Sequence, residues 1–279
     1  MEGCITTEFV RRYRPAFPRK AGIVNGFYVA FHKVITFGTG SIVAMMVHLK
    51  RYGVPPETSY GLGTTQYVMH RIAVTLYATV CILLEHDFFM TYFEKYRIFI
   101  YVSYGVTVAV SLCLLGICLS RRIHRLILGL LRRLGIQRRY PGFTSALEDK
   151  MTVLQHQTAL LLQSKGRLCR VFLLEMLKLS CWFVIPYLAL WGTGSLNGLS
   201  FPQAVSVIAI VTVLIGVIPT PGNIASIELI YTLLFTVVVG EVAAGSTMLL
   251  YRFATFYLPF LAGMAVTFWL RVRDIRRGK

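Results

Sequence analysis

Apolar residues in this chain gather in long runs that are separated by short polar and basic stretches, a pattern typical of membrane-embedded helices. Four runs hold roughly 20 predominantly apolar residues, which is enough to cross a bilayer as a helix. They are 60–84, 98–119, 171–191 and 245–270. Two further apolar regions, 22–49 and 203–239, are interrupted by glycine and proline. The sequence therefore predicts about four full spans and two broken segments.

The break in the second interrupted region is the strongest local signal. Pro219 and Pro221 lack a backbone N–H donor, and Gly222 and Asn223 are residue types that tolerate left-handed turns. Each flanking arm has about 16 residues, or roughly 24 Å of helix, against a bilayer core of about 30 Å. These arms predict a helical hairpin whose break is buried in protein or lines a wet cavity. An ordinary turn between two short spans is the alternative.

Composition and charge confirm the membrane class and limit the partners. Of the 279 residues, 56% are hydrophobic and 15% are charged, which is far too apolar for a soluble domain of this length. The net charge of +17 comes from basic clusters that flank the apolar runs, as the positive-inside rule and anionic lipids predict. The clusters lie at 11–20, 121–139, 165–170 and 271–279. Nucleic acid is excluded as a partner, because no folded polar domain carries the charge.

The positive-inside rule also predicts sidedness. The basic loops fall on one side only if 22–49 enters and leaves from the cytoplasmic face and 203–239 enters from the opposite face. We therefore predict an all-α, multi-pass protein with two re-entrant hairpins and with both termini in the cytoplasm. Its parts are a basic leader (1–21), an embedded domain (22–270) that contains a cytoplasmic helical loop (121–170), and a basic tail (271–279).

A faint internal repeat accompanies this topology. Gly40 in the first hairpin corresponds to Gly222 in the second, and Arg71 in one span corresponds to Arg252 in another. The spacings are 31 and 30 positions. Two inverted units with broken helices at matching places are the architecture of many secondary transporters. The match covers few identical residues, so chance similarity is the alternative.

Charged residues inside apolar segments are the best functional candidates, because such charges are costly unless they are paired or hydrated. Glu175 and Lys178 are three positions apart near the end of a span, so we expect them to pair with each other or to extend toward the membrane interface, and we set them aside as functional candidates. Glu228 and Arg252 leave two interpretations open, a structural ion pair and a substrate contact. The candidates for a substrate path are Gly40, Arg71, Pro219, Pro221, Gly222, Asn223, Glu228, Arg252 and Tyr257.

The motifs of enzyme active sites do not occur. The sequence contains no glycine-rich phosphate loop, no Ser/His/Asp arrangement and no metal-ligand spacing, so we predict no catalytic residue, no metal site and no cofactor. The six histidines are isolated in the sequence and are expected to be polar fillers or interface residues rather than bases. The six cysteines are scattered and are expected to be reduced and structural.

Three stretches resemble the transmembrane (flippase) region of bacterial lysylphosphatidylglycerol synthase. The stretch Val217-Ile-Pro-Thr-Pro-Gly-Asn-Ile-Ala-Ser-Ile-Glu228 is similar to its Pro-x-Pro-Gly-Gly-x-Gly-x-x-Glu signature. The stretch from Leu250 to Gly263, which contains Arg252 and Tyr257-Leu-Pro259, resembles the aromatic-rich signature that follows it. Residues 35–55 resemble the first-half Thr-Pro-x-x-x-Gly-Gly motif and its downstream loop.

The chain departs from the family pattern in two respects. Phe37 replaces a proline, and Ser41 and Asn223 each replace a glycine. The family has one or two helices before the first hairpin, and this chain begins almost directly at it, so we expect a stand-alone and possibly N-terminally truncated member. The soluble domain that transfers lysine from charged tRNA to phosphatidylglycerol in the two-domain enzymes does not follow the last span, so lysyltransferase activity is not expected.

The resemblance implies a function. It predicts a lipid translocase of the bacterial plasma membrane that moves a lysylphosphatidylglycerol-type or other charged phospholipid between leaflets, in connection with resistance to cationic peptides. Anionic or aminoacylated membrane phospholipids would then be its partners. The alternative is a membrane subunit without transport activity that positions a lipid-modifying synthase through residues 121–170.

Overall fold

The computed structural model describes residues 1–119, 163–217, 220 and 225–276, together with single positions between 120 and 162. Every regular element in these residues is helical, which confirms the all-α class. Several predicted features lie outside the described residues. They are most of the cytoplasmic loop at 121–170, the end of the tail at 277–279, and Pro219, Pro221, Gly222 and Asn223.

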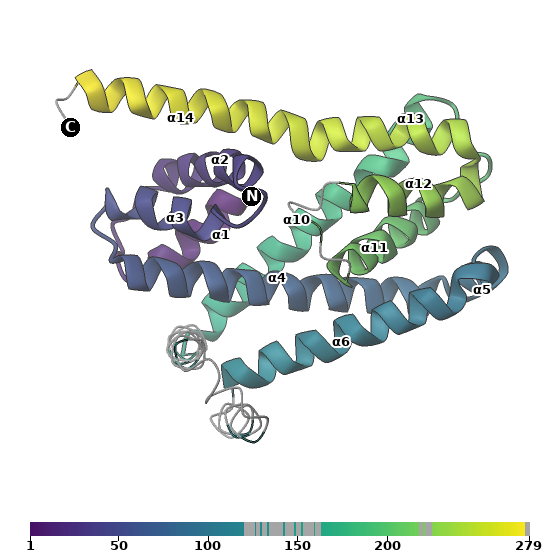
Figure 1. The fold of residues 1–279 in the computed structure, drawn as a ribbon, viewed down its shortest axis with the longest axis horizontal. Helices are drawn as coiled ribbons and strands as arrows, with labels where there is room; N and C mark the ends of the chain where they lie inside the picture. Colours follow the sequence, from purple (N-terminus) through teal and green to yellow (C-terminus); the bar gives the residue numbers. More distant parts are fainter. Residues whose placement is uncertain are drawn as a thin grey trace.

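Three helical segments of the described chain are long and apolar enough to cross a membrane (Figure 1). They are Pro56–Leu84, Glu94–Cys118 and Glu241–Arg276, and they agree with three of the four predicted spans. The elements concerned are α4 (Pro56–Leu84), η1 (Glu94–Tyr96), α6 (Arg97–Leu119), α13 (Glu241–Arg252), η3 (Phe253–Tyr257) and α14 (Leu258–Arg276). A short helix, α5 (His86–Tyr92), joins α4 to η1.

The fourth predicted span requires a correction. Residues 171–191 do form a helix, α10 (Lys165–Gly192; 28 residues), but α10 is not among the three helical segments that qualify as candidate membrane spans. The prediction rested on the apolar C-terminal half of this helix. Its N-terminal half carries five charged residues, which lower its apolar character: Lys165, Arg167, Arg170, Glu175 and Lys178. The described residues thus support three spans rather than four.

Both interrupted regions form helical hairpins. The first consists of α2 (Arg19–Ile35) and α3 (Ser41–Lys50), and the second of α11 (Phe201–Val217) and α12 (Ser226–Val239); in each hairpin the two arms pack against each other. The first break follows from its backbone, because Phe37 and Gly38 adopt left-handed φ values of 51° and 91°. Re-entry from opposite membrane faces stays a prediction.

Each hairpin packs with one arm on the helix that follows it in the chain and with the other arm on a long helix of the other half. Helix α3 packs on the following helix α4, and α12 packs on the following helix α13. The first arm of each hairpin instead packs on a long helix from the other half of the chain: α2 packs on α14, and α11 packs on α4. The hairpins therefore lie toward opposite ends of the molecule, with long helices running between them (Figure 1). This pairing is the one that two related units would produce, whereas their inversion about the membrane plane stays a prediction.

The leader contains a packed helix that the sequence pattern did not predict. Helix α1 (Glu2–Val10) lies against α2, with Ile5, Phe9 and Val10 buried. The two backbones touch at Gly3 and Gly22, where a Cβ atom on either residue would collide with the backbone carbonyl of the other. Small residues allow such close helix approach in membrane proteins.

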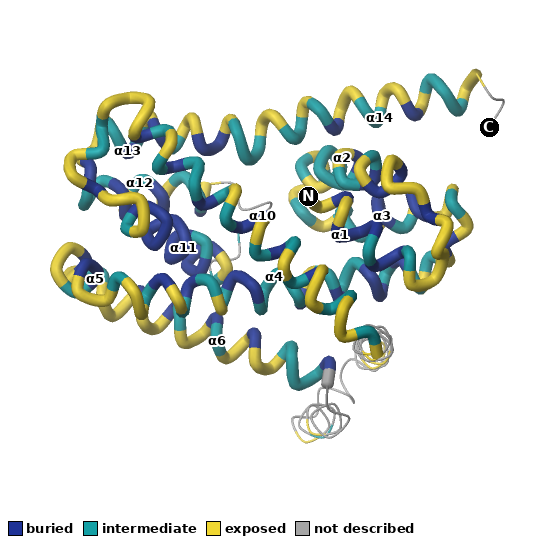
Figure 2. Tube along the Cα trace, turned by 180° about the vertical axis from the view of Figure 1, so that it is seen from behind, coloured by how far each residue is buried: buried dark blue, intermediate teal, exposed yellow. Residues whose placement is uncertain are grey.

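The buried apolar residues form two main cores (Figure 2). The smaller core joins α1, α2, α3 and the beginning of α4, and the larger core joins the end of α4 to α10, α11, α12 and α13. Helices α4 and α10 contribute to both cores. On α4 the change falls between Met69 and Ala73, and on α10 the two cores overlap between Val171 and Met176. Four charged or titratable side chains lie at or next to this boundary: His70, Arg71, Glu175 and Lys178.

Candidate functional site

An ion pair stands beside the break of the second hairpin. Arg252 Nη2 lies 2.6 Å from Glu228 Oε1. Glu228 belongs to the first turn of α12, where a carboxylate also interacts favourably with the helix dipole. Arg252 is the last residue of α13, and its guanidinium carbon lies 4.3 Å from the centre of the Phe256 ring. Two predicted path residues are therefore brought into direct contact.

This ion pair has unused hydrogen-bonding capacity. The Arg252 side chain is 6% exposed and the Glu228 side chain 31% exposed. Arg252 Nε and Glu228 Oε2 are both buried, and neither has a hydrogen-bond partner in the described part of the chain. A buried polar atom without a partner costs free energy, about 1–3 kcal/mol. The pair thus offers one donor and one acceptor to a polar group that enters from the exposed side of Glu228.

The local chain explains where Glu228 stands. Ala225, directly before α12, has a left-handed φ of 69°, so the backbone turns sharply into the helix. The hydroxyls of Thr220 and Ser226 lie 2.7 Å apart and share a hydrogen bond across the break. This bond ties the end of the break to the first turn of α12.

A π-helical turn, η3, follows Arg252. Pro259 has no N–H to donate, and its ring crowds the carbonyl one turn earlier, so the chain widens into a π-turn just before it. This turn carries Phe256, which lies under the Arg252 guanidinium. It also carries Tyr257, which is half exposed and packs by its edge on Phe256. Tyr257 thus neighbours the ion pair without contacting it.

Arg71 reaches the second hairpin from α4. Its guanidinium lies against Gly216 on α11, in the space that the Cβ atom of any larger residue at position 216 would need. Its Nε donates a hydrogen bond of 3.0 Å to the Tyr67 hydroxyl. In the described part of the chain no carboxylate lies within ion-pair distance of Arg71. Arg71 therefore presents an uncompensated positive charge at the end of α11, close to the break.

Gly40 is placed differently from the other candidates. Its N–H donates a 2.8 Å hydrogen bond to the Thr36 hydroxyl, and the Thr36 side chain lies where a Cβ atom on Gly40 would stand. Gly40 therefore shapes the first turn. The structure brings it into contact with no charged path residue among those it describes.

A second group of charges, which we call the inter-core cluster, lies between the two cores. It consists of Glu2, Gln66, His70, Glu175 and Lys178. Lys178 Nζ lies 2.5 Å from Glu175 Oε2 and 3.1 Å from Glu2 Oε1. The predicted Glu175–Lys178 pair is confirmed. The sequence prediction set this pair aside as self-contained, and the structure shows that it connects three helices.

His70 and Gln66 complete the inter-core cluster from α4. His70 Nδ1 lies 3.1 Å from Glu175 Oε2, and Gln66 Nε2 donates a 2.6 Å hydrogen bond to Glu2 Oε2. His70, which is isolated in the sequence, therefore lies in a polar cluster between helices, in keeping with the expectation of a polar filler or interface residue. The spacing of one helical turn between Gln66 and His70 hinted at a shared polar face, but nothing in the sequence linked that face to Glu2.

The charge of Glu2 is stabilised by its surroundings. Packing by neighbouring helices opposes ionisation, but Lys178 and His70 outweigh this effect and lower the pKa of the Glu2 carboxyl below its ordinary value. Lys178 also hydrogen-bonds to this carboxylate directly. The inter-core cluster therefore holds α1 by a charge as well as by apolar packing.

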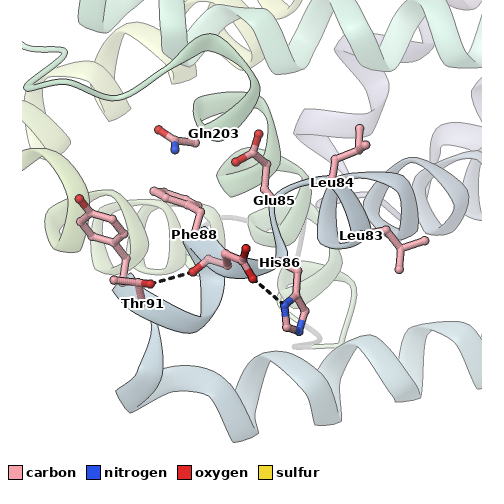
Figure 3. Close-up of a pocket in the computed structure, with 9 residues that line it drawn as sticks. Leu83, Leu84, Glu85, His86, Phe88, Thr91 and Gln203 are labelled. Carbon is pink, nitrogen blue, oxygen red and sulfur yellow. Dashed lines mark hydrogen bonds and ion pairs between the residues drawn. The ribbon is translucent and has the colours of Figure 1, made fainter.

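A surface pocket lies apart from both groups of charges (Figure 3). It is formed at the α4–α5 turn, where His86 Nδ1 lies 3.4 Å from Asp87 Oδ1, and it reaches Gln203 at the beginning of α11. The break of the second hairpin is at the other end of α11, roughly 24 Å along the helix axis. The pocket therefore does not adjoin the predicted path.

Comparison with known proteins agrees with the resemblance found in the sequence. The family model described as "Lysylphosphatidylglycerol synthase TM region" matches residues 24–263. The match includes both hairpins, Arg71, Glu228 and Arg252, and also His70, Glu175 and Lys178, whereas Glu2 lies outside it. No curated protein and no solved structure matches the chain.

Proposed function

The chain belongs to the lysylphosphatidylglycerol synthase TM region family, and from this premise we propose that it is a lipid translocase. The family match supports a function connected with membrane lipids. Our proposal is more specific: the protein moves an aminoacylated or other charged phospholipid between the two leaflets of a bacterial plasma membrane. Such a protein would contribute to resistance against cationic peptides by changing the charge of the outer leaflet.

The observation that carries this proposal is the Arg252–Glu228 pair with its unused donor and acceptor. A phospholipid that bears an amino acid presents a phosphate and an ammonium group. A guanidinium is the side chain best suited to phosphate oxygens, and a carboxylate accepts hydrogen bonds from ammonium. A charged headgroup cannot cross hydrocarbon alone, because its desolvation is prohibitive. A site of paired charges beside a helix break would lower that barrier.

Arg71 supplies a second phosphate contact in this proposal. It approaches the same break from α4 and has no carboxylate partner among the described residues. A phosphate that leaves Arg252 would therefore find another cation beside Gly216, two residues before the break. The remaining path candidates keep the roles expected from the sequence, as parts of the two breaks or their rims: Gly40, Pro219, Pro221, Gly222, Asn223 and Tyr257.

Transport between leaflets also requires the predicted sidedness. We propose that both termini face the cytoplasm and that residues 85–97 and 192–202 face outward. Single cysteines near Asp87 and Asn197 should react with a membrane-impermeant thiol reagent in intact cells. Cysteines near Arg133 and Arg276 should react only after permeabilisation. Labelling of the Arg133 site in intact cells would contradict the arrangement of two opposed hairpins.

The activity is tested with purified protein in phospholipid vesicles. We expect leaflet exchange of fluorescent lysylphosphatidylglycerol to be faster than in protein-free vesicles, and Glu228→Gln to reduce this rate. Glu241→Gln, an identical change at an exposed carboxylate in the first turn of α13, is the matched control and should leave the rate unchanged. Equal rates with and without protein would contradict transport and favour a subunit that positions a lipid-modifying synthase.

A further inference from the structure

We propose that the protein binds an anionic phospholipid at a second site, where the end of α3 meets the C-terminal part of α14. Both lie at the same end of the molecule (Figure 1). Three charged residues form the site, which we call the α3–α14 clamp: Arg51, Arg273 and Asp274. Asp274 lies 22 positions after Arg252, roughly 33 Å along a helix, so the clamp is separate from the translocation site.

The two arginines of the clamp share one carboxylate. Asp274 Oδ2 lies 2.7 Å from Arg51 Nη1, and Asp274 Oδ1 lies 4.0 Å from Arg273 Nη2. One aspartate balances only one guanidinium, so the clamp keeps a net charge of +1. The arginine side chains are 35% and 32% exposed, and Arg273 Nε is buried without a hydrogen-bond partner among the described residues. The clamp therefore has the charge and the free donors that a phosphate group needs.

The chain next to the clamp adds further positive charge. Lys50 directly precedes Arg51, and Arg14 donates a hydrogen bond to the backbone carbonyl of Tyr52. Within the described part of the chain, neither Lys50 nor Arg14 has a carboxylate at ion-pair distance. An anion is therefore attracted to this end of α3 from several sides.

An exposed apolar face of α3 leads to the clamp. Val43, Val47 and Arg51 are spaced four positions apart, and Arg51 continues the helical backbone, so the three side chains lie along one face. Val43 is 59% exposed and Val47 is 48% exposed. From Val43 to Arg51 the helix rises about 12 Å, close to the roughly 15 Å of half a bilayer core. An acyl chain can therefore lie along the valines while its phosphate is at Arg51, which favours a phospholipid over a free phosphate.

Trp269 indicates the depth of the clamp in the membrane. Its ring centre lies 4.9 Å from the guanidinium carbon of Arg273, and the residue is 53% exposed. Tryptophan is enriched where the headgroups meet the hydrocarbon. In the predicted sidedness this end of the molecule faces the cytoplasm, whose leaflet carries anionic lipids. A lipid bound here would connect the first hairpin to the last helix.

Binding is tested in vesicles by the fluorescence of Trp269, with Trp182 and Trp191 replaced by phenylalanine. A brominated acyl chain quenches a tryptophan that it contacts, so brominated phosphatidylglycerol is compared with brominated phosphatidylcholine of the same chains. We expect a preference of about five-fold for the anionic lipid, which is what one net basic charge at a membrane surface provides. Arg51→Gln and Arg273→Gln should each abolish this preference, because either change leaves the clamp neutral.

The matched control is Arg276→Gln, which removes the same charge from an exposed position near the end of α14 and should keep the preference. Asp274→Asn should increase the preference, because it removes the carboxylate of the clamp. Absence of a preference in the parent protein, or an equal loss in Arg276→Gln, would overturn the site in favour of diffuse surface charge. If the arginine variants do not fold, Asp274→Asn decides, and a preference that does not increase overturns the site.

Inorganic phosphate separates a lipid ligand from a soluble one. At constant ionic strength, excess phosphate should leave the preference unchanged, because it gains nothing from the apolar face of α3. Loss of the preference in phosphate would assign the clamp to a soluble anion and contradict the lipid site. None of these measurements depends on exchange between leaflets, so failure of the clamp leaves the translocase proposal standing, and absence of exchange leaves the clamp standing.

Discussion

The Arg252–Glu228 pair and the inter-core cluster both contain buried charges, and both keep a buried carboxylate oxygen without a partner among the described residues, but they differ in how many helices their ion pairs join. Arg252 and Glu228 each keep a buried polar atom without a partner, and Glu228 is partly exposed. In the inter-core cluster, Glu175 and Lys178 are almost fully buried, and Lys178 bonds to two carboxylates from two helices. The first group is arranged to accept a further polar group, and the second holds three helices together.

This comparison separates two uses of charge inside one membrane protein. A buried ion pair that joins several helices gives modest stability, but removing one member strands the other and is strongly destabilising. An ion pair with spare capacity gains a partner only when a ligand arrives. The two groups should therefore respond in opposite ways to substitution, with stability changing most in one and transport in the other.

The largest effect on stability is expected for Lys178→Met. Among the described residues, the substitution leaves buried Glu175 with His70 as its only bonded partner, at a cost on the order of 3–5 kcal/mol. The melting temperature in detergent should fall sharply. Lys95→Met, the same change at an exposed lysine, should cost less than about 0.5 kcal/mol. Equal melting temperatures of the two variants would show that the inter-core cluster does not hold the helices together.

Arg71→Gln should act on transport rather than on stability. Arg71 has no carboxylate partner among the described residues, so the melting temperature should change little. A lost charged hydrogen bond to phosphate is worth about 1.5–3 kcal/mol, which corresponds to roughly a 10- to 100-fold fall in lipid exchange. Arg71→Lys should recover part of the rate because it keeps the charge. Full exchange in Arg71→Gln would remove Arg71 from the path.

The smallest effect on the melting temperature is expected for Glu2→Gln, and this effect should depend on pH. Because the pKa of Glu2 is lowered in the folded protein, its contribution to stability is present above the ordinary pKa and is lost as the pH falls through the folded pKa. Glu2→Gln should therefore melt below the parent protein at neutral pH, and the difference should disappear in acid. A difference that does not depend on pH would show that Glu2 acts through packing alone.

The pattern of the sequence predicted the hairpins and singled out Arg252 and Glu228 as candidates, with an ion pair between them as one of two interpretations, for physical reasons. Glycine and proline interrupt helices locally, and a charge in an apolar run stands out wherever its partner lies. The pattern could not predict the inter-core cluster, because Glu2 lies in a leader without a long apolar run and its contact with Lys178 spans 176 positions. The pattern also predicted a full span at 171–191, because the C-terminal half of α10 is apolar, whereas its N-terminal half carries five charged residues.

The two halves of the predicted repeat differ in the charged residues that they carry. Arg71 and Arg252 correspond in the predicted repeat, and each lies against the second hairpin. Arg252 meets the carboxylate of Glu228, whereas the first hairpin has no carboxylate at the matching place, where Met46 stands. The charged site is therefore asymmetric even though the helix pairing is reciprocal. We expect the second hairpin to recognise the headgroup and the first to shape its turn.

The central claim, that Arg252 and Glu228 contact a lipid headgroup, is tested most directly by melting temperature and lipid exchange measured together. The variants are Glu228→Gln, Arg252→Gln, and a double variant that replaces both with apolar residues of similar size. We predict that Glu228→Gln keeps its folded yield while exchange falls, and that the double variant is folded and inactive. A double variant that recovers both stability and exchange would show that the pair is structural and would contradict the claim.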